Sequence, residues 1–446
     1  MHISQMYLNL TRKKIGMTRL PHELLLLEER RWDYGTPKAE LEPLIDYWAE
    51  IYDWRSRETL YNNALPQFRT IIGLRTETVK GSLLGITEVI PDTPLRRLHF
   101  AHIRSPSKKA IPLLFCHGWP GSFIEVSKVV DALSDPVSTP PKVQHNDIDF
   151  HIVAPNIPGF GFSDPSTEEH FGPKATAAVF DRLMKNLGYT CYVVYGASWG
   201  FKVARCLAMD SGSGCVAVYT TSPDLPAPSA WQNLLHWLKY QIARLTDASI
   251  PLLSFGYTPS DFAPICDLSG KTQGNALFKN KLYLEHLRSP QTVAYGLCDS
   301  PVGLLACMLD TLRVSSTPDV LPDALVTAQG HTSLWKHEEI LDCTMLQWLP
   351  GPEDGLRWLH QAMREDCWSS YTHVPLGITV FENSCPPMWA AAGQRVVWVK
   401  RHQGSTDWPA WEAPSEVAAD LRTYCRRLLE WGLLRGLDKA IVNEVD

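Results

Sequence analysis

The pentapeptide GASWG at residues 196–200 has the residue types and spacing of a nucleophile elbow, the sharp strand-to-helix turn that exposes a catalytic side chain. It follows the apolar run from Thr190 to Tyr195, which we expect to be a strand, and a helix is expected after it. The small residues around Ser198 allow a tight turn, and a helix N-terminus supplies backbone N–H groups and the positive end of a dipole. The sequence therefore predicts an active site at Ser198.

A second turn, HGWPGS at residues 117–122, follows another apolar run. Such a turn can offer a backbone N–H to a developing oxyanion, and we expect the N–H groups of Trp119 and Trp199 to be the two donors. His117 has two interpretations, since it either takes part in the chemistry or only braces the turn through hydrogen bonds. We favour the bracing role.

Short apolar runs alternate with helical segments from residue 111 onward, which indicates a parallel sheet covered on both faces. Between residues 224 and 372 the alternation of strands and helices stops, and we expect the helix-rich insert found there to cap the active site. Before residue 111, apolar residues from Leu41 to Tyr52 recur at helical spacing. We predict strands at residues 97–104, 111–116, 150–154, 190–195, 215–219, 376–381 and 395–400, and helices that begin near Ile124 and Ser415.

The composition excludes several classes of function. A net charge of −6 over 446 residues, without a basic run, argues against nucleic-acid binding. No run approaches the roughly twenty apolar residues of a membrane-spanning helix, and no signal peptide is recognisable, so we expect a cytoplasmic protein. The 11 cysteines lack C-x-x-C spacing, which favours buried, reduced thiols over a metal site. The 16 tryptophans suit a pocket for an apolar ligand and suit a plain core equally well.

Several motifs together resemble the microsomal-type epoxide hydrolases over nearly the whole chain. They are WDYG at 32–35, YDWR at 52–55, LPQF at 65–68, HGWPGS at 117–122, PGFGFS at 158–163, DSPVGLLA at 299–306 and WEAP at 411–414. The resemblance implies an α/β-hydrolase fold, with a mostly parallel sheet flanked by helices. It divides the chain into an epoxide-hydrolase-like N-terminal region at 1–110, a core at 111–223 and 373–446, and a helical cap at 224–372. It also implies an apolar small-molecule substrate and no cofactor, and it leaves a homodimer open.

The chemistry that the resemblance implies requires residues that this chain has replaced. The family opens epoxides with an Asp carboxylate at the elbow, where this chain has Ser198. The ester that results is hydrolysed by water that a His activates, and this His position falls on Asp407. An acid that orients the His should follow the strand at 376–381. Glu382 is close to that position, but the ungapped match is Ser384.

The family also holds the epoxide oxygen with two tyrosines from the cap. The second of these positions maps to Leu359 or His360, while Tyr283 and Tyr295 lie near the first. Trp408, which directly follows the His position, is a further candidate for the pocket wall.

Each replacement changes the available chemistry. A serine hydroxyl is a poor nucleophile unless a base removes its proton. An Asp has an ordinary pKa of about 3.9 and is a weak base, but burial under an apolar cap raises such a pKa and would make Asp407 a useful acid or base. His402 or His360 could instead serve Ser198 as a relocated base. Asp224, after the fourth strand, could be an acid or only a turn residue.

Four functions remain open. We rank first a non-covalent acid/base reaction on an apolar small molecule: opening of an epoxide by an internal nucleophile, cyclisation or isomerisation. Asp407 and His360 would handle protons, and Ser198 would donate a hydrogen bond. By analogy, such a step belongs to natural-product biosynthesis. The alternatives are a Ser198-dependent ester or lactone hydrolase, a catalytically inactive binding protein, and residual epoxide hydrolysis by water with Asp407 or Glu382 as the base.

Overall fold

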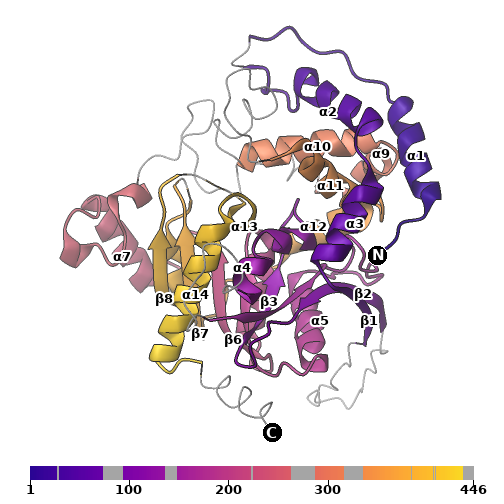
Figure 1. Ribbon diagram of the computed structural model, residues 1–446. Helices are drawn as coiled ribbons and strands as arrows, with labels where there is room; N and C mark the ends of the chain where they lie inside the picture. Colours follow the sequence, from indigo (N-terminus) through magenta and orange to yellow (C-terminus); the bar gives the residue numbers. More distant parts are fainter. Residues whose placement is uncertain are drawn as a thin grey trace, which may run out of the picture.

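The computed structural model describes residues 1–27, 30–73, 94–135, 148–221, 223, 225–262, 287–315, 335–382, 384–404, 406 and 408–434 (Figure 1). Three of the candidate residues, Asp224, Tyr283 and Asp407, lie outside the described residues.

An eight-stranded sheet forms the centre of the molecule, in the order β1-β2-β4-β3-β5-β6-β7-β8. β2 runs antiparallel to both of its neighbours, and all the other pairs are parallel. β3, β4 and β5 are buried along their whole length, as expected for parallel strands covered on both faces. The strands are β1 (Gln67–Gly73), β2 (Pro94–Ile103), β3 (Ile111–Cys116), β4 (Phe150–Pro155), β5 (Tyr192–Gly196), β6 (Cys215–Thr221), β7 (Thr372–Val380) and β8 (Gln394–Arg401).

The predicted strands are confirmed, since each of them falls on one of β2 to β8. β1 was not predicted, and its position explains why. It lies at the edge of the sheet, where Phe68 and Ile71 are 49% and 66% exposed. A break in register between Thr70 and Ile72 also interrupts the period of two that would mark a strand.

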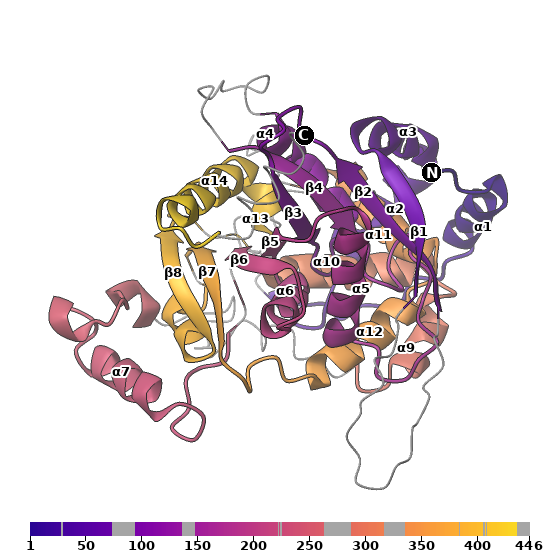
Figure 2. The ribbon, with the colours of Figure 1, turned by 90° about the horizontal axis from the view of Figure 1, so that it is seen from below.

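Helices cover both faces of the sheet. Figure 2 shows α4 and α14 on one side of it and α5 and α6 on the other. The closing helix predicted near Ser415 is α14. The helix predicted near Ile124 begins as a short 3₁₀ helix, η2, and continues as α4, a common form for a short connector. The elements are η2 (Phe123–Lys128), α4 (Val130–Ser134), α5 (Pro173–Asn186), α6 (Trp199–Met209), η6 (Pro387–Ala392), α13 (Pro409–Glu412) and α14 (Pro414–Glu430).

The described parts of the insert between β6 and β7 are mainly helical, and two of their helices pack against the N-terminal helices. α10 contacts α1 and α2, and α11 contacts α2, while α7 projects beside β8, away from them (Figure 1). No single helix in the described ranges is long and apolar enough to cross a membrane. α9 and α10 up to Leu312 pass that test only together, and the chain bends by 120° between them. The elements are α1 (Gln5–Gly16), α2 (Lys38–Glu50), α3 (Trp54–Ala64), α7 (Leu234–Leu245), η3 (Pro251–Leu253), η4 (Pro259–Phe262), α9 (Pro290–Leu297), α10 (Pro301–Ser315), α11 (His337–Trp348) and α12 (Glu353–Arg364).

A buried carboxylate fastens the N-terminal helices to the insert. Asp342, on α11, is fully buried and accepts hydrogen bonds from Tyr52 Oη at 2.7 Å and Tyr61 Oη at 2.5 Å. Arg57 Nε donates to its Oδ2 at 2.9 Å, and Nη2 of the same guanidinium donates at 2.5 Å. Burial raises the pKa of Asp342, and the bonds from Arg57 and the tyrosines oppose that rise. The network joins segments almost three hundred residues apart in the sequence.

The helix that follows the elbow, α6, also holds the end of the insert. Lys202 Nζ donates to the carbonyl of Ala362 at 2.8 Å. The side chain of Arg205 is fully buried, and it donates to the carbonyls of Cys367 at 3.1 Å and Ser370 at 2.5 Å. Burial lowers the pKa of Arg205 to about 10. The chain leaving α12 is therefore bound to α6 through its carbonyl groups.

Candidate active site

Ser198 has the strained geometry that the elbow motif predicts. It lies between β5 and α6 with φ of 52° and ψ of −127°, a conformation that residues with a side chain seldom adopt. The glycines on either side are required by close contacts. A Cβ on Gly200 would lie 2.2 Å from the carbonyl oxygen of Cys116, and one on Gly196 would lie 2.6 Å from that of Gly200. The sequence therefore folds here as a tight strand–helix turn with Ser198 at its tip.

The HGWPGS turn lies directly against Ser198. A Cβ built on Gly118 would be 3.0 Å from Ser198 Cβ and 3.5 Å from Ser198 Oγ, so a side chain there would crowd the serine and the two turns would have to shift apart slightly. Trp199 is the first residue of α6, and its N–H therefore has no acceptor within the helix. Trp119 is buried, and its indole Nε1 donates to Gln347 Oε1 at 3.1 Å. The two predicted oxyanion donors belong to turns that meet at the serine.

His117 holds two loops together. Its Nε2 accepts the backbone N–H of Ile157 at 3.1 Å, so in the neutral ring the proton is on Nδ1, which donates to the carbonyl of Gly118 at 2.9 Å. Burial lowers the pKa of His117 to about 4, which keeps the ring neutral near pH 7. This geometry is that of a brace between the oxyanion turn and the loop after β4.

A buried carboxyl group beside this turn was missed by the sequence reasoning. Glu125, on η2, is 3% exposed, and its Oε2 lies 3.2 Å from the position of a Cβ on Gly121. Within the described part of the chain that oxygen has no hydrogen-bond partner, and the same is true of Ser122 Oγ and Trp408 Nε1. Burial raises the pKa of Glu125 to about 7. The one signal in the sequence was an acidic residue inside the apolar run that follows the turn.

The loop after β8 returns to the same turn. Trp408 is 5% exposed, and its Cζ3 is 4.0 Å from the Cβ position of Gly121. Glu412 is half-buried and accepts hydrogen bonds from Thr406 Oγ1 and, at 2.8 Å, from Trp335 Nε1. Burial raises the pKa of Glu412. Thr406 and Trp408, which flank Asp407 in the sequence, are therefore both buried.

His402 and His360 are the two candidates to replace the family's histidine base. His402 is paired with Asp420. Its Nε2 lies 2.7 Å from Asp420 Oδ2, which also accepts from Thr379 Oγ1 at 2.8 Å, and its ring stacks on Phe381. His402 follows β8, which is three strands from β5, and strands are spaced about 4.8 Å apart, so roughly 14 Å separates the two strand ends. Among the described residues, His402 makes no hydrogen bond to Ser198, and its Nε2 is engaged with Asp420.

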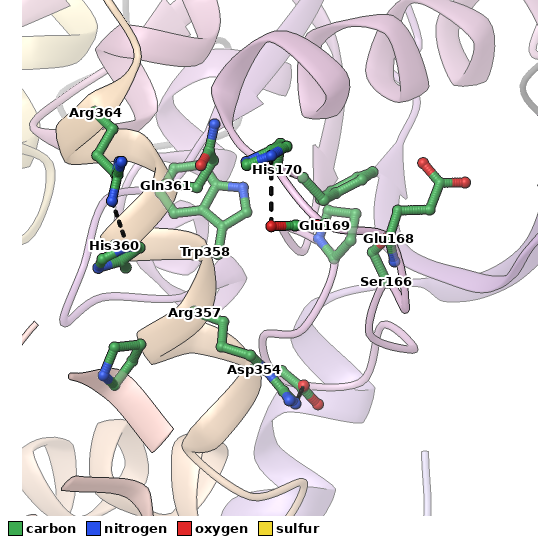
Figure 3. Close-up of a pocket in the computed structure, with 13 residues that line it drawn as sticks. Ser166, Glu168, Glu169, His170, Asp354, Arg357, Trp358, His360, Gln361 and Arg364 are labelled. Carbon is green, nitrogen blue, oxygen red and sulfur yellow. Dashed lines mark hydrogen bonds and ion pairs between the residues drawn. The ribbon is translucent and has the colours of Figure 1, made fainter. Parts of the chain in front are cut away.

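His360 lies in a separate cleft between α12 and the loop after β4. The cleft has a volume of about 310 Å³ (Figure 3). His360 Nδ1 lies 2.5 Å from the carbonyl oxygen of Leu287, and Arg364 Nη1 is 3.4 Å from Nε2. Among the described residues, the lining includes Trp358, Arg357 and Glu169 and does not include Ser198. The structure therefore gives no contact between His360 and the elbow.

Comparison with known proteins identifies the family. Residues 1–126 match the model of the epoxide hydrolase N terminus, and residues 111–250 match that of the alpha/beta hydrolase fold. Epoxide hydrolase 1 of Sus scrofa is 27% identical over 419 residues, which cover 89% of this chain and 82% of the relative. The chain belongs to the epoxide hydrolase family of α/β-hydrolases.

Solved structures of this family have the same fold. The juvenile hormone epoxide hydrolase of the silkworm Bombyx mori superimposes with a TM-score of 0.73 at 22% identity, covering 98% of this chain and 94% of that one. The Aspergillus niger epoxide hydrolase superimposes with a TM-score of 0.64 at 23% identity, covering 96% and 95%. The α/β-hydrolase fold predicted from the motifs is confirmed.

The other positions taken from the family have varied surroundings. Glu382 is exposed, and its backbone N–H donates to the carbonyl of Gly404 at 2.8 Å. Ser384 is half-buried and Leu359 is fully buried. Tyr295, on α9, is 75% exposed, so its side chain does not line a buried pocket. Within the described ranges no group of three or more His, Cys, Asp or Glu side chains is arranged to hold a metal ion.

Proposed function

We propose that this epoxide hydrolase family member carries out non-covalent acid/base chemistry on an apolar small molecule at the Ser198 elbow. The reaction class is epoxide opening by an internal nucleophile, cyclisation or isomerisation. The proposal rests on the surroundings of the Ser198 hydroxyl. Among the described residues no histidine bonds to Ser198 Oγ, and His117, His402 and His360 are each held by other groups. A serine without a base is a hydrogen-bond donor rather than a nucleophile.

Carboxyl groups are the proposed proton carriers. In the ungapped sequence match, Asp407 falls at the position of the family's base, and its sequence neighbours Thr406 and Trp408 are buried. Glu125, beside the oxyanion turn, has a pKa of about 7, so near neutral pH both of its protonation states are accessible. The N–H groups of Trp119 and Trp199, together with the Ser198 hydroxyl, would stabilise negative charge that develops on a substrate oxygen. The rate enhancement would come from binding the substrate in a reactive conformation and from proton transfer.

A fluorophosphonate probe tests the state of Ser198. The purified protein is incubated with the probe, and the Ser198-containing peptide is examined by mass spectrometry, with Ser198→Ala as the matched control. We expect no labelling, because among the described residues no histidine is placed to remove the hydroxyl proton. Stoichiometric labelling at Ser198 would overturn the proposal in favour of an ester or lactone hydrolase.

Asp407→Asn tests the proton carrier. The amide keeps the shape of the side chain and cannot transfer a proton, so turnover of apolar epoxides or polyenes should fall by about 10²-fold or more. The thermal midpoint of the variant should stay close to that of the wild type. Full activity in this variant would exclude Asp407 from the reaction, and a wild type without turnover on any such substrate would favour a binding protein.

A further inference from the structure

Two cysteine sulfurs lie in contact where α6 meets the end of the cap. Sγ of Cys206, on α6, is 3.4 Å from Sγ of Cys367, which lies between α12 and β7. Both side chains are buried, with 6% and 2% exposure. A disulfide bond is about 2.05 Å long, so the sulfurs need to approach by roughly 1.4 Å. We propose that Cys206 and Cys367 form a redox-sensitive pair that closes to a disulfide and ties the elbow helix to the chain leaving the cap.

The surroundings of this pair differ from those of an ordinary core thiol. A buried cysteine normally packs as a small apolar group. Cys425 is an example: it is fully buried, and burial raises the pKa of its thiol. In the pair, the hydrogen bond from Cys206 lowers the pKa of Cys367, and the ammonium of Lys202 acts in the same direction. The pKa of Cys206 is raised in return. Because the thiolate is the reactive form, Cys367 is the sulfur that would attack an oxidant.

The chemistry balances with a peroxide as the oxidant. The Cys367 thiolate attacks one peroxide oxygen, an S–O bond forms, the O–O bond breaks, and one water leaves after protonation. The sulfur of Cys206 then attacks the sulfenic sulfur, so that the S–S bond forms and the S–O bond breaks. A second water leaves. In total, the two thiols lose two electrons and two protons, and hydrogen peroxide becomes two molecules of water.

The polypeptide around the pair is already held in place for this bond. Arg205, the residue before Cys206, donates to the carbonyl of Cys367 at 3.1 Å and to that of Ser370 at 2.5 Å. Lys202 binds the carbonyl of Ala362 at the end of α12. A disulfide would therefore add a covalent link to a contact that polar bonds already maintain. It would restrict separation of the two segments, whatever reaction the Ser198 site carries out.

Peptide mapping after oxidation tests the pair directly. The full-length reduced protein is treated with graded hydrogen peroxide, its free thiols are alkylated under denaturing conditions, and the digest is searched for a Cys206–Cys367 linked peptide. The exposed Cys298 is an internal measure of oxidant dose. We expect the linked peptide, a decrease of two in the 11 alkylatable thiols at low peroxide, and full reversal by dithiothreitol. Cys206→Ser and Cys367→Ser should each abolish the link, while Cys425→Ser should leave it intact.

The contrary outcome is equally clear. If Cys206 and Cys367 both remain alkylatable at a peroxide dose that oxidises Cys298, the proposal is wrong. Links from either cysteine to a third cysteine would also overturn it. The mapping on the wild type decides the question even if a variant fails to fold, and it does not depend on any assay of activity.

Discussion

At the scale of single residues, the backbone of Ser198 stores strain. A residue with a Cβ held at φ of 52° and ψ of −127° costs about 1–3 kcal/mol, which the surrounding packing must offset. Glycine removes most of that cost, although its greater freedom in the unfolded chain takes back part of the gain. Ser198→Gly should therefore be more stable than Ser198→Ala by about 1 kcal/mol in urea unfolding. Equal midpoints for the two variants would show that the elbow is not strained.

Glu125 should make the stability of the protein depend on pH. Its pKa is near 4.5 in the unfolded chain and about 7 in the folded one, so between these values the folded protein holds a proton that the unfolded chain releases. Stability from this group is complete below pH 4.5 and falls as the pH rises toward 7, by roughly 3 kcal/mol in total. The lowered pKa of His117 acts in the opposite direction, because protonation of the unfolded chain begins below pH 6.5.

The Glu125→Gln variant isolates this effect. The amide does not titrate, so the difference in unfolding free energy between variant and wild type should shift in favour of the variant from pH 5 to pH 8. Exposed Glu430→Gln is the control and should show little such trend. The measurement is guanidinium unfolding at four or five pH values. A difference that stays constant with pH would place the Glu125 pKa at its ordinary value.

At the scale of elements, the Asp342 network is a buried polar connection between the N-terminal helices and the cap. Asp342→Asn leaves Arg57 partly buried without a charged partner there, and breaking a buried pair in this way costs about 3–5 kcal/mol. Thermal unfolding should show a marked fall in the midpoint. Glu430→Gln, which breaks the exposed pair with Arg427, should change it little. A small effect in both variants would mean that apolar packing alone joins α3 to α11.

Elements and site residues were predictable to different degrees, for physical reasons. β3, β4 and β5 are buried along their whole length because both faces of the sheet are covered there, and the apolar runs that result are visible in a sequence. The GASWG and HGWPGS turns were predictable because close backbone contacts require glycine at fixed spacing. The Asp342 network and the His402–Asp420 pair were not, because partners far apart in the chain carry no local pattern. Glu125 was missed because an acidic residue in an apolar run does not reveal whether it is paired.

At the scale of the whole molecule, the N-terminal helices α1 and α2 are part of the packing of the cap. Leu44 and Trp48 of α2 are buried, Tyr47 Oη donates to Glu338 at 2.8 Å, and Trp348 Nε1 donates to Thr11 Oγ1 at 2.8 Å. Deleting residues 1–66 should expose this apolar surface on α10 and α11, so the truncated chain should aggregate in size-exclusion chromatography and bind a hydrophobic dye. Co-expression of the deleted fragment should restore a soluble species. A monodisperse truncated protein would show that the cap stands without these helices.

The course of α6 has a mechanical consequence. The helix begins at the elbow, with Ser198 as its cap, and one and two turns later Lys202 and Arg205 hold the end of α12 and the chain beyond it. An α-helix is a stiff rod that advances 1.5 Å and turns about 100° per residue. The rigid helix therefore fixes the position of Ser198 relative to the chain that leaves the cap. A single residue inserted in α6 before Lys202 would rotate the side chains of Lys202 and Arg205 away from the carbonyls that they bind, while leaving Ser198 in place.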